Sequence, residues 1–266
     1  MKLKYPAEAF AFGIVLFSAG MKEAFAAGIL VLLTTVFAET LKNLLEDWVP
    51  QWSLYLCVSI GTASLCASVF LLGFTALGIP VDNTGMWIMT CILGLFVVKH
   101  VLSGAIDGEY GELFWESAIA WGFWILLAVA REFFGAGTIF GNVIFQGEFQ
   151  SKIFLDTMFG FLTAGMTLAF TNGVLRKKSH GTHSLLLVLP LAIFMRPFTM
   201  ESFGAVLGQI WTIAVPVILF WSVKVTLKFA RTSRAYKGLP VEMLSMGFIY
   251  MILSIYYKTS GLNKMP

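Results

Sequence analysis

The sequence has little charge, few cysteines and no long polar stretch. Only 12% of its 266 residues are charged, whereas a soluble domain carries about 25%. No polar stretch is long enough to form a domain that binds a nucleotide. A phosphate-binding glycine loop with a lysine and an HExxH zinc motif are both missing. Its three cysteines, all in apolar segments, form no disulfide framework, and its three histidines show no metal-ligand spacing with them. These absences exclude the common soluble enzyme classes.

Apolar residues, in contrast, make up 58% of the chain and include 25 phenylalanines and 8 tryptophans. One soluble core of this size cannot bury them all. Repeated apolar runs of about 20 residues are typical of helices that cross a lipid bilayer. The net charge of +3 is small and clustered, so it indicates membrane topology and no nucleic-acid partner. The basic start MKLK runs on without a clean cleavage site, so we expect no cleavable signal peptide.

The sequence therefore predicts an all-α integral membrane protein with about nine transmembrane or half-transmembrane helices. The nine apolar segments cover about 8–20, 24–45, 53–77, 86–99, 113–134, 153–175, 184–196, 203–229 and 241–257.

Two basic clusters predict the orientation of the chain. RKKSHGTH (176–183) and KFARTSRAYK (228–237) are typical of cytoplasmic loops. An even number of predicted crossings separates them, so both can lie on the same side. Counting through the nine segments then places the N-terminus in the cytoplasm and the C-terminus outside.

The first, fourth and seventh segments are short, with about 12–14 apolar residues each, fewer than a crossing needs. They favour half-helices or re-entrant elements. The chain is then three copies of one unit, at about 8–77, 86–175 and 184–257. An odd number of crossings per copy makes adjacent copies inverted, which is a known way to build a site at the midplane. The alternative is nine ordinary helices, some of them short or tilted, with the charges at the membrane interface.

Charged residues interrupt each short segment. Lys22 with Glu23, Lys99 with His100, and Arg196 stand at these positions. In re-entrant segments these charges approach the midplane, need acidic partners and mark an ion path. Alternatively, the long side chains reach the headgroups. The candidate acidic partners are Glu23, Glu39, Glu116 and Glu201.

The stretch REFFGAGTIFG (131–141) resembles a known family signature. It matches the pattern Arg-Glu-x-x-Gly-x-Gly-Thr-hydrophobic-Phe-Gly. This pattern is found in the small integral membrane subunits of the Rnf and Na⁺-translocating NADH:quinone oxidoreductase (Nqr) complexes, of the RnfA/RnfE and NqrD/NqrE kind. LLEDWVP (44–50) resembles the end of the family's second helix, and Cys91 in WIMTCILG (87–94) matches its second-half cysteine. The resemblance covers about residues 8–175.

This resemblance implies a six-helix membrane domain at 1–178, with inverted halves, followed here by an additional three-helix unit at 179–266. It implies a [2Fe-2S] cluster near mid-membrane between two such subunits, with Cys91 as a ligand. The first half-helix (9–20) has no cysteine, so a homodimer supplies two matched thiols where the family uses four.

The implied function is that of a subunit of a redox-driven, ion-translocating electron-transport complex. The resemblance implies that the chain is not catalytic alone. We expect it to help to pass electrons across a bacterial-type inner (cytoplasmic) membrane or to couple them to Na⁺ or H⁺ movement. The implied partners are other membrane and redox subunits and a related pseudo-symmetric subunit. The alternatives are a stand-alone inverted-repeat transporter or channel-like protein without redox activity, and a cofactor-free structural subunit.

Single residues also allow two interpretations. Arg131 and Glu132, with Gly135, Gly137 and Gly141, form either a structural latch at the end of the fifth segment or an ionisable functional pair. In the latch, we expect Arg131 to bind the free carbonyls at the end of that helix. We expect Glu132 to offset the charge of Arg131 or to meet a basic residue from another copy of the repeated unit. Cys91 is either an iron ligand or a small buried apolar residue. Cys57 and Cys66 lie about 180° apart on one helix, so we expect them to be packing residues.

Overall fold

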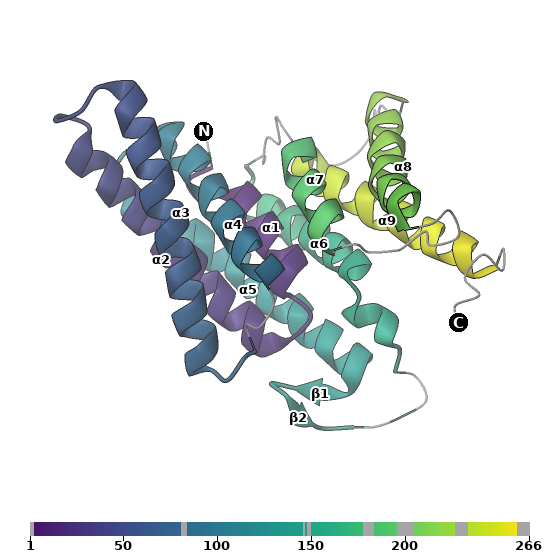
Figure 1. The fold of residues 1–266 in the computed structure, drawn as a ribbon. Helices are drawn as coiled ribbons and strands as arrows, with labels where there is room; N and C mark the ends of the chain where they lie inside the picture. Colours follow the sequence, from purple (N-terminus) through teal and green to yellow (C-terminus); the bar gives the residue numbers. More distant parts are fainter. Residues whose placement is uncertain are drawn as a thin grey trace.

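In a computed structural model of the chain, the described residues are 3–80, 84–145, 147, 150–177, 184–195, 205–226 and 234–259. They form nine α-helices, two short strands and two 3₁₀ turns, shown in Figure 1. The helices are α1 (Ala7–Phe17), α2 (Met21–Leu45), α3 (Gln51–Ala76), α4 (Thr84–Leu102), α5 (Tyr110–Ala136), α6 (Thr157–Leu175), α7 (Ser184–Met195), α8 (Ala205–Thr226) and α9 (Leu239–Thr259). The strands are β1 (Thr138–Ile139) and β2 (Asn142–Val143), and the 3₁₀ turns are η1 (Lys152–Leu155) and η3 (Arg234–Tyr236).

Seven of these helices are long and apolar enough to cross a membrane, namely α2, α3, α4, α5, α6, α8 and α9. Their outer faces carry large apolar side chains, among them Leu56, Ile60 and Leu72 on α3 and Trp221 on α8. Water would disfavour such faces, whereas lipid chains do not. The prediction of an all-α, multi-pass membrane protein is confirmed at this level.

The predicted pattern of short segments is correct for two positions and wrong for the third. Helices α1 and α7 are short apolar helices below the length of a crossing. Helix α4 instead continues through Lys99 and His100 to Leu102 and is long enough to span. The two basic residues do not end this helix because they lie in its last turn, where positive charge is favourable beside the free carbonyls.

Helix α1 lies in the interior of the bundle. Its residues 9 to 17 are all buried, as expected for a helix that is apolar on every side. It runs parallel to α5, since Phe10 contacts Trp124 with ring centroids 6.0 Å apart and Ser18 lies beside Arg131. It runs antiparallel to α6, where the backbone of Val15 packs against Gly160. A short apolar helix is thus surrounded by longer ones.

Glycines allow the longer helices to approach each other closely. A Cβ atom on Gly28 of α2 would collide with the indole of Trp121 on α5. A Cβ on Gly94 of α4 would meet the backbone of Ala63 and the side chain of Cys66 on α3. Small residues at helix contacts are typical of membrane bundles, where close packing supplies much of the association energy.

The C-terminal helices α7, α8 and α9 lie together on one side of the bundle, opposite α2 and α3 (Figure 1). Helix α9 packs along α6, because Gly165 faces Leu244 and Gly247 faces Leu162. Residues after 183 therefore extend the six-helix bundle through α6.

A β-hairpin follows α5 and was not predicted by the all-α interpretation. Thr138 pairs with Val143 and Ile139 with Asn142 in an antiparallel ladder. The two loop residues, Phe140 and Gly141, have φ of 57° and 78°. Positive φ at both positions is the requirement of a two-residue type I′ turn. Gly141, the last glycine of the signature, thus occupies the second position of the hairpin turn.

Candidate functional site

Arg131 lies near the C-terminal end of α5 and is only 3% exposed. Its Nε donates to the carbonyl of Phe154 at 2.7 Å and its Nη2 to the carbonyl of Asp156 at 2.8 Å. Its Nη1 donates to the hydroxyl of Ser18, which follows the last residue of α1. The planar guanidinium therefore joins the end of α1 to the turn that leads into α6.

Glu132, the next residue, is 6% exposed and binds a different set of groups. Its Oε2 accepts a hydrogen bond from the backbone N–H of Met21 at 2.7 Å. Its Oε1 accepts from the N–H of Gly141 at 2.8 Å and from the hydroxyl of Thr138 at 2.9 Å. Met21 is the first residue of α2, so the carboxylate stands at a helix N-terminus, where negative charge is stabilised.

These partners correct the expected form of the latch. Arg131 binds carbonyls before α6 and not the carbonyls at the end of its own helix. Within the part of the chain that the structure describes, Glu132 binds backbone amides and a hydroxyl and no basic side chain. Together the two side chains join four elements, namely α1, α2, the β-hairpin and α6. We call this group of contacts the Arg131 node.

The three glycines of the signature all serve the same node. Gly137 ends α5 with φ of 69°, and its N–H donates to the carbonyl of Phe133 at 2.9 Å. This is the left-handed cap that favours glycine. Gly141 has positive φ in the hairpin turn, whereas Gly135 is helical and lies against Leu155, where a Cβ would collide.

A second buried carboxylate, Glu116, lies at the other end of α1. It is 2% exposed, and its Oε2 accepts from the N–H groups of Lys4 at 2.6 Å and Tyr5 at 3.2 Å. Its Oε1 accepts from the ammonium of Lys177 at 2.5 Å. A second carboxylate, Glu112, lies 3.4 Å from the same ammonium. We call Glu116 and these partners the Glu116 cluster.

The charges of this cluster shift the pKa values of nearby groups. A hydrogen bond from its ammonium to Glu109, 2.6 Å away, raises the pKa of Lys4. Burial lowers the pKa of Lys177, but the bonds to Glu116 and Glu112 outweigh it, so the pKa is raised overall. Burial, and then the charge of Glu116, raise the pKa of the Tyr5 phenol.

The Arg131 node and the Glu116 cluster lie at opposite ends of α1. Both bind backbone groups next to that helix. From Tyr5 to Ser18 the chain rises on the order of 20 Å, at about 1.5 Å per residue. The hydrocarbon core of a bilayer is about 30 Å thick. The separation of the two groups along α1 is therefore smaller than the thickness of the hydrocarbon core, where polar groups must be satisfied by the protein.

Four other residues that the sequence singled out, namely Lys22, Glu23, Lys99 and His100, lie at these two ends of α1. Lys99 forms an ion pair with Glu8 at 2.7 Å, a partner that the sequence did not indicate. Next to it, Nε2 of His100 lies 2.7 Å from the carbonyl of Lys4. At the other end, the ammonium of Lys22 lies 5.9 Å from the centre of the Phe140 ring. The carboxylate of Glu23 lies over Gly20 at the start of α2.

Among the predicted ion-path residues that the structure describes, Glu39 is the most deeply buried. It is 0% exposed on α2, and the ammonium of Lys42 lies 3.8 Å from its Oε1. Arg196 and its candidate partner Glu201 lie outside the described residues.

Cys91 lies half-buried on α4. The prediction that Cys57 and Cys66 face opposite ways is confirmed, since Cys57 is exposed and Cys66 buried. Cys66 packs against Gly94, about one turn along α4 from Cys91. Cys66 and Cys91 are therefore near neighbours across the contact between α3 and α4. The sequence did not indicate this proximity of Cys66 and Cys91.

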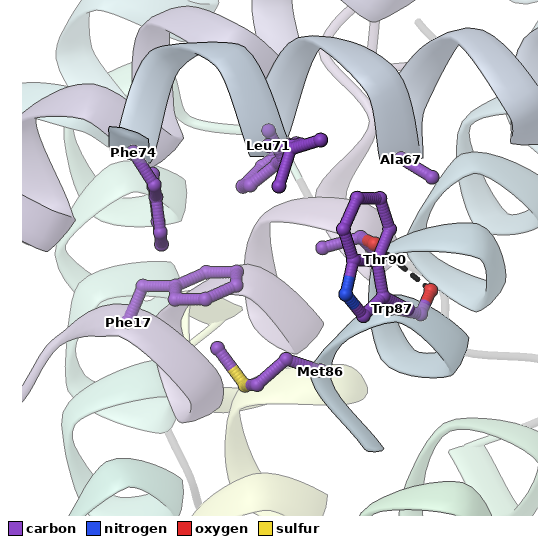
Figure 2. Close-up of a pocket in the computed structure, with 8 residues that line it drawn as sticks. Phe17, Ala67, Leu71, Phe74, Met86, Trp87 and Thr90 are labelled. Carbon is purple, nitrogen blue, oxygen red and sulfur yellow. Dashed lines mark hydrogen bonds between the residues drawn. The ribbon is translucent and has the colours of Figure 1, made fainter. Parts of the chain in front are cut away.

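An apolar pocket lies beside Cys91, between the end of α1 and helices α3 and α4. Figure 2 shows its walls, among them Phe17, Phe74, Met86 and Trp87. Thr90, the residue before Cys91, also lines it and donates a hydrogen bond to the carbonyl of Trp87 at 2.9 Å. The pocket lining thus offers aromatic and thioether surface and little polarity.

The thiols of one chain do not complete an iron–sulfur cluster, which takes about four cysteine ligands. Cys91 and Cys66 are two donors, and Cys57 lies on an exposed face. No group of three or more His, Cys, Asp or Glu side chains within the described residues is arranged to hold a metal ion. A cluster at Cys91 would therefore require thiols from a second chain.

Comparison of the chain with protein-family models, curated proteins and solved structures found no match in any of the three. The likeness to the Rnf and Nqr subunits therefore rests on the quoted motifs.

Sequence reasoning missed the central role of Glu116 and Ser18. Glu116 had appeared only as one of several candidate acidic partners. Its position was a usable signal, because it stands between Trp115 and the apolar run of α5. A carboxylate in such a segment requires donors from the protein. No comparable signal marked Ser18, since a serine after an apolar helix is common.

Proposed function

We propose that the chain is an integral membrane subunit of a redox-driven, ion-translocating electron-transport complex. The Arg131 node carries the proposal. The signature residues that resemble the Rnf and Nqr subunits are used together at one point, where they join α1, α2, the hairpin and α6. A motif that occurred by chance in a helix end would have no reason to place each of its polar residues in one network.

In this role the chain is a scaffold and does not bind the electron donor. The sequence has no polar stretch that could form a nucleotide or flavin domain. Partner subunits must therefore supply those sites. Cys91, beside the pocket between α3 and α4, is the position where a [2Fe-2S] cluster shared with a pseudo-symmetric subunit would be held. Such a cluster supplies one-electron transfer near the middle of the membrane.

The proposal includes inverted halves at about 8–77 and 86–175 and a third unit after residue 178. The short helices α1 and α7 support a repeated unit, whereas the length of α4 departs from it. We also propose that the N-terminus lies in the cytoplasm and the C-terminus outside. This orientation counts all nine apolar segments as crossings, the short helices α1 and α7 included, because the basic clusters at 176–183 and 228–237 then share the cytoplasmic side. The membrane is then a bacterial-type inner membrane.

A second candidate is a stand-alone transporter without redox activity. The observation that favours it is the pair of buried charged groups at the two ends of α1, together with Glu39. Ionisable side chains within a membrane bundle commonly mark ion or proton pathways. A third candidate is a cofactor-free structural subunit. It would bind the same partner subunits as the redox candidate but would hold no cluster at Cys91.

One experiment separates these candidates. The chain is tagged in its native membrane, extracted in mild detergent and purified, and the co-purifying proteins are identified by mass spectrometry. Flavin- or cluster-bearing partners, with visible absorbance bleached by dithionite, support the proposal. A colourless homo-oligomer that transports an ion in liposomes would refute it in favour of the transporter. A colourless chain bound to redox partners would indicate the structural subunit.

A further inference from the structure

Glu39 is a buried carboxyl group without a hydrogen-bond donor. It lies on α2, two turns before the helix ends, and is 0% exposed. Within the described part of the chain neither of its oxygens accepts a hydrogen bond. Burying an ionised carboxylate without donors costs several kcal/mol or more, and such a group commonly takes up a proton instead.

The groups that face Glu39 come from its own helix and from the loop between α4 and α5. Lys42, one turn away, places its ammonium 3.8 Å from Oε1, beyond hydrogen-bond distance. The backbone amide of Gly108 lies near the carboxylate but outside hydrogen-bond geometry, and the charges of Asp107 and Glu46 complete the polar surroundings. The charges of Asp107 and Glu46 oppose a further negative charge on Glu39, whereas the ammonium of Lys42 favours it.

Glu116 provides an internal comparison. It is almost as deeply buried as Glu39, at 2% exposed. It nevertheless accepts hydrogen bonds from two backbone amides and from Lys177. The fold thus surrounds one buried carboxylate with donors and leaves the other without them. This contrast between two buried acids distinguishes a structural group from one that exchanges its proton.

We propose that Glu39 is a proton-binding site. An O–H bond forms at its carboxylate with a proton taken from water at this end of the bundle. The proton returns to water when the ammonium of Lys42 moves from 3.8 Å to hydrogen-bond distance of the carboxylate. Lys42 is half-buried and the adjacent Asp107 is exposed, so water reaches the neighbourhood of the site.

The same geometry argues against a metal cation at Glu39. The ammonium of Lys42 already stands beside the carboxylate and would repel a second cation. A hard cation also requires about six oxygen ligands. The structure, over the residues it describes, brings no three acidic or metal-binding side chains together for this purpose. A proton needs only the carboxylate itself.

This inference does not rest on the proposed function. A transporter and a redox subunit could both use a proton site on α2. If no redox partners are found, the proposal of a proton site at Glu39 still holds. If Glu39 binds no proton, the proposal of redox partners still holds. The two proposals are therefore tested by separate measurements.

Infrared spectroscopy of the purified full chain in liposomes tests the site. A protonated carboxyl gives a C=O stretch that an ionised one lacks. We expect Glu39→Gln to remove one such band, and the wild-type band to disappear as pH rises. In Lys42→Met the band should disappear only at a higher pH than in the wild type. We expect a difference of at least about tenfold in proton concentration, or about 1.4 kcal/mol. Lys22→Met, at the other end of the same helix, should leave it unchanged.

A band that Glu39→Gln leaves unchanged would overturn the proposal. Loss of the band in sodium chloride but not in choline chloride of equal ionic strength would also overturn it, in favour of a sodium site. If Glu39→Gln does not assemble, dicyclohexylcarbodiimide labelling of the unaltered protein replaces it. Peptide mass spectrometry should then find the adduct on Glu39 at least about tenfold more than on Glu116. Equal labelling of both, or none on Glu39, contradicts the site.

Discussion

The carboxylate of Glu132 accepts a hydrogen bond from the backbone N–H of Met21 at 2.7 Å, although 111 residues separate them. This bond places the end of α5 against the first turn of α2. At the other end of α1, Glu116 accepts from the N–H of Lys4 in the same way. Two acids on one helix thus hold the backbone on both sides of the short buried helix α1.

The first prediction concerns Arg131. Arg131→Ala removes the donor that the buried hydroxyl of Ser18 and the half-buried carbonyl of Phe154 share, whereas the carbonyl of Asp156 keeps two backbone N–H donors. A buried polar group left unsatisfied costs about 1–3 kcal/mol, so the amount of folded protein in the membrane should fall. Arg131→Lys should recover little of it, because one ammonium cannot reproduce three diverging bonds. Detergent-solubilised yield and thermal stability measure this. Normal assembly with abolished transport or electron transfer would instead make Arg131 part of the mechanism.

The second prediction concerns Gly137. Its φ of 69° excludes a β-branched residue, and a Cβ there would collide with the carbonyl of Phe145 and with Gln150. Gly137→Val should therefore cost more than about 2 kcal/mol and be as damaging as Arg131→Ala. Gly122→Val is the matched control, since nothing lies within 4 Å of its Cβ position. Equal thermal stability of the two variants would contradict this interpretation.

The third prediction concerns Cys91. If it binds a cluster shared with a partner, Cys91→Ser should abolish the electron paramagnetic resonance signal of the reduced complex and leave assembly intact. If it only packs, the serine should cost about 1–3 kcal/mol for a half-buried hydroxyl. Cys57→Ser, at an exposed position on α3, is the control. An unchanged spectrum in the Cys91 variant would rule out ligation.

The fourth prediction concerns alkaline pH. The pKa values of Lys4, Lys177 and Tyr5 are all raised in the folded chain. The lysine contributions are complete below their ordinary value of 10.5 and are lost as pH rises through the folded values. The unfolded chain ionises its tyrosine above pH 10.0, where the folded chain still holds the phenol neutral. Stability should thus fall in alkali.

Thermal unfolding in detergent from neutral pH to above pH 10.5 checks this expectation. Tyr5→Phe should flatten the alkaline slope and change neutral stability little, because its hydroxyl has no hydrogen-bond partner among the described residues. Lys177→Met should also flatten the slope, at a lower stability throughout. Stability that increases above pH 10.0 would contradict the assigned directions.

The fifth prediction concerns orientation. With the basic clusters at 176–183 and 228–237 in the cytoplasm, a reporter fused after Pro266 should be active outside only. A reporter fused before Met1 should be active only inside. Paired phosphatase and fluorescent-protein fusions at the C-terminus measure this. A C-terminal fusion that is active only in the cytoplasm would reverse the scheme.

The sequence by itself determined the class of the protein and most of its helices. Long apolar runs have one stable outcome in a bilayer, because a helix satisfies its own backbone. Gly137 of the signature has a positive φ, a conformation that glycine adopts readily. The length of α4 was misjudged because Lys99 and His100 were treated as interruptions, whereas the last turn of a helix accepts positive charge.

Only the tertiary structure decided which groups meet the buried charges. Nothing local to Arg131 indicates Ser18, Phe154 or Asp156, and nothing local to Lys99 indicates Glu8. These partners are chosen by the packing of α1 among α2, α4, α5 and α6, which are distant in sequence. The same packing gave Glu116 three donors and left Glu39 with none. Burial and hydrogen bonding depend on which helices are neighbours, and helix periodicity alone does not fix that.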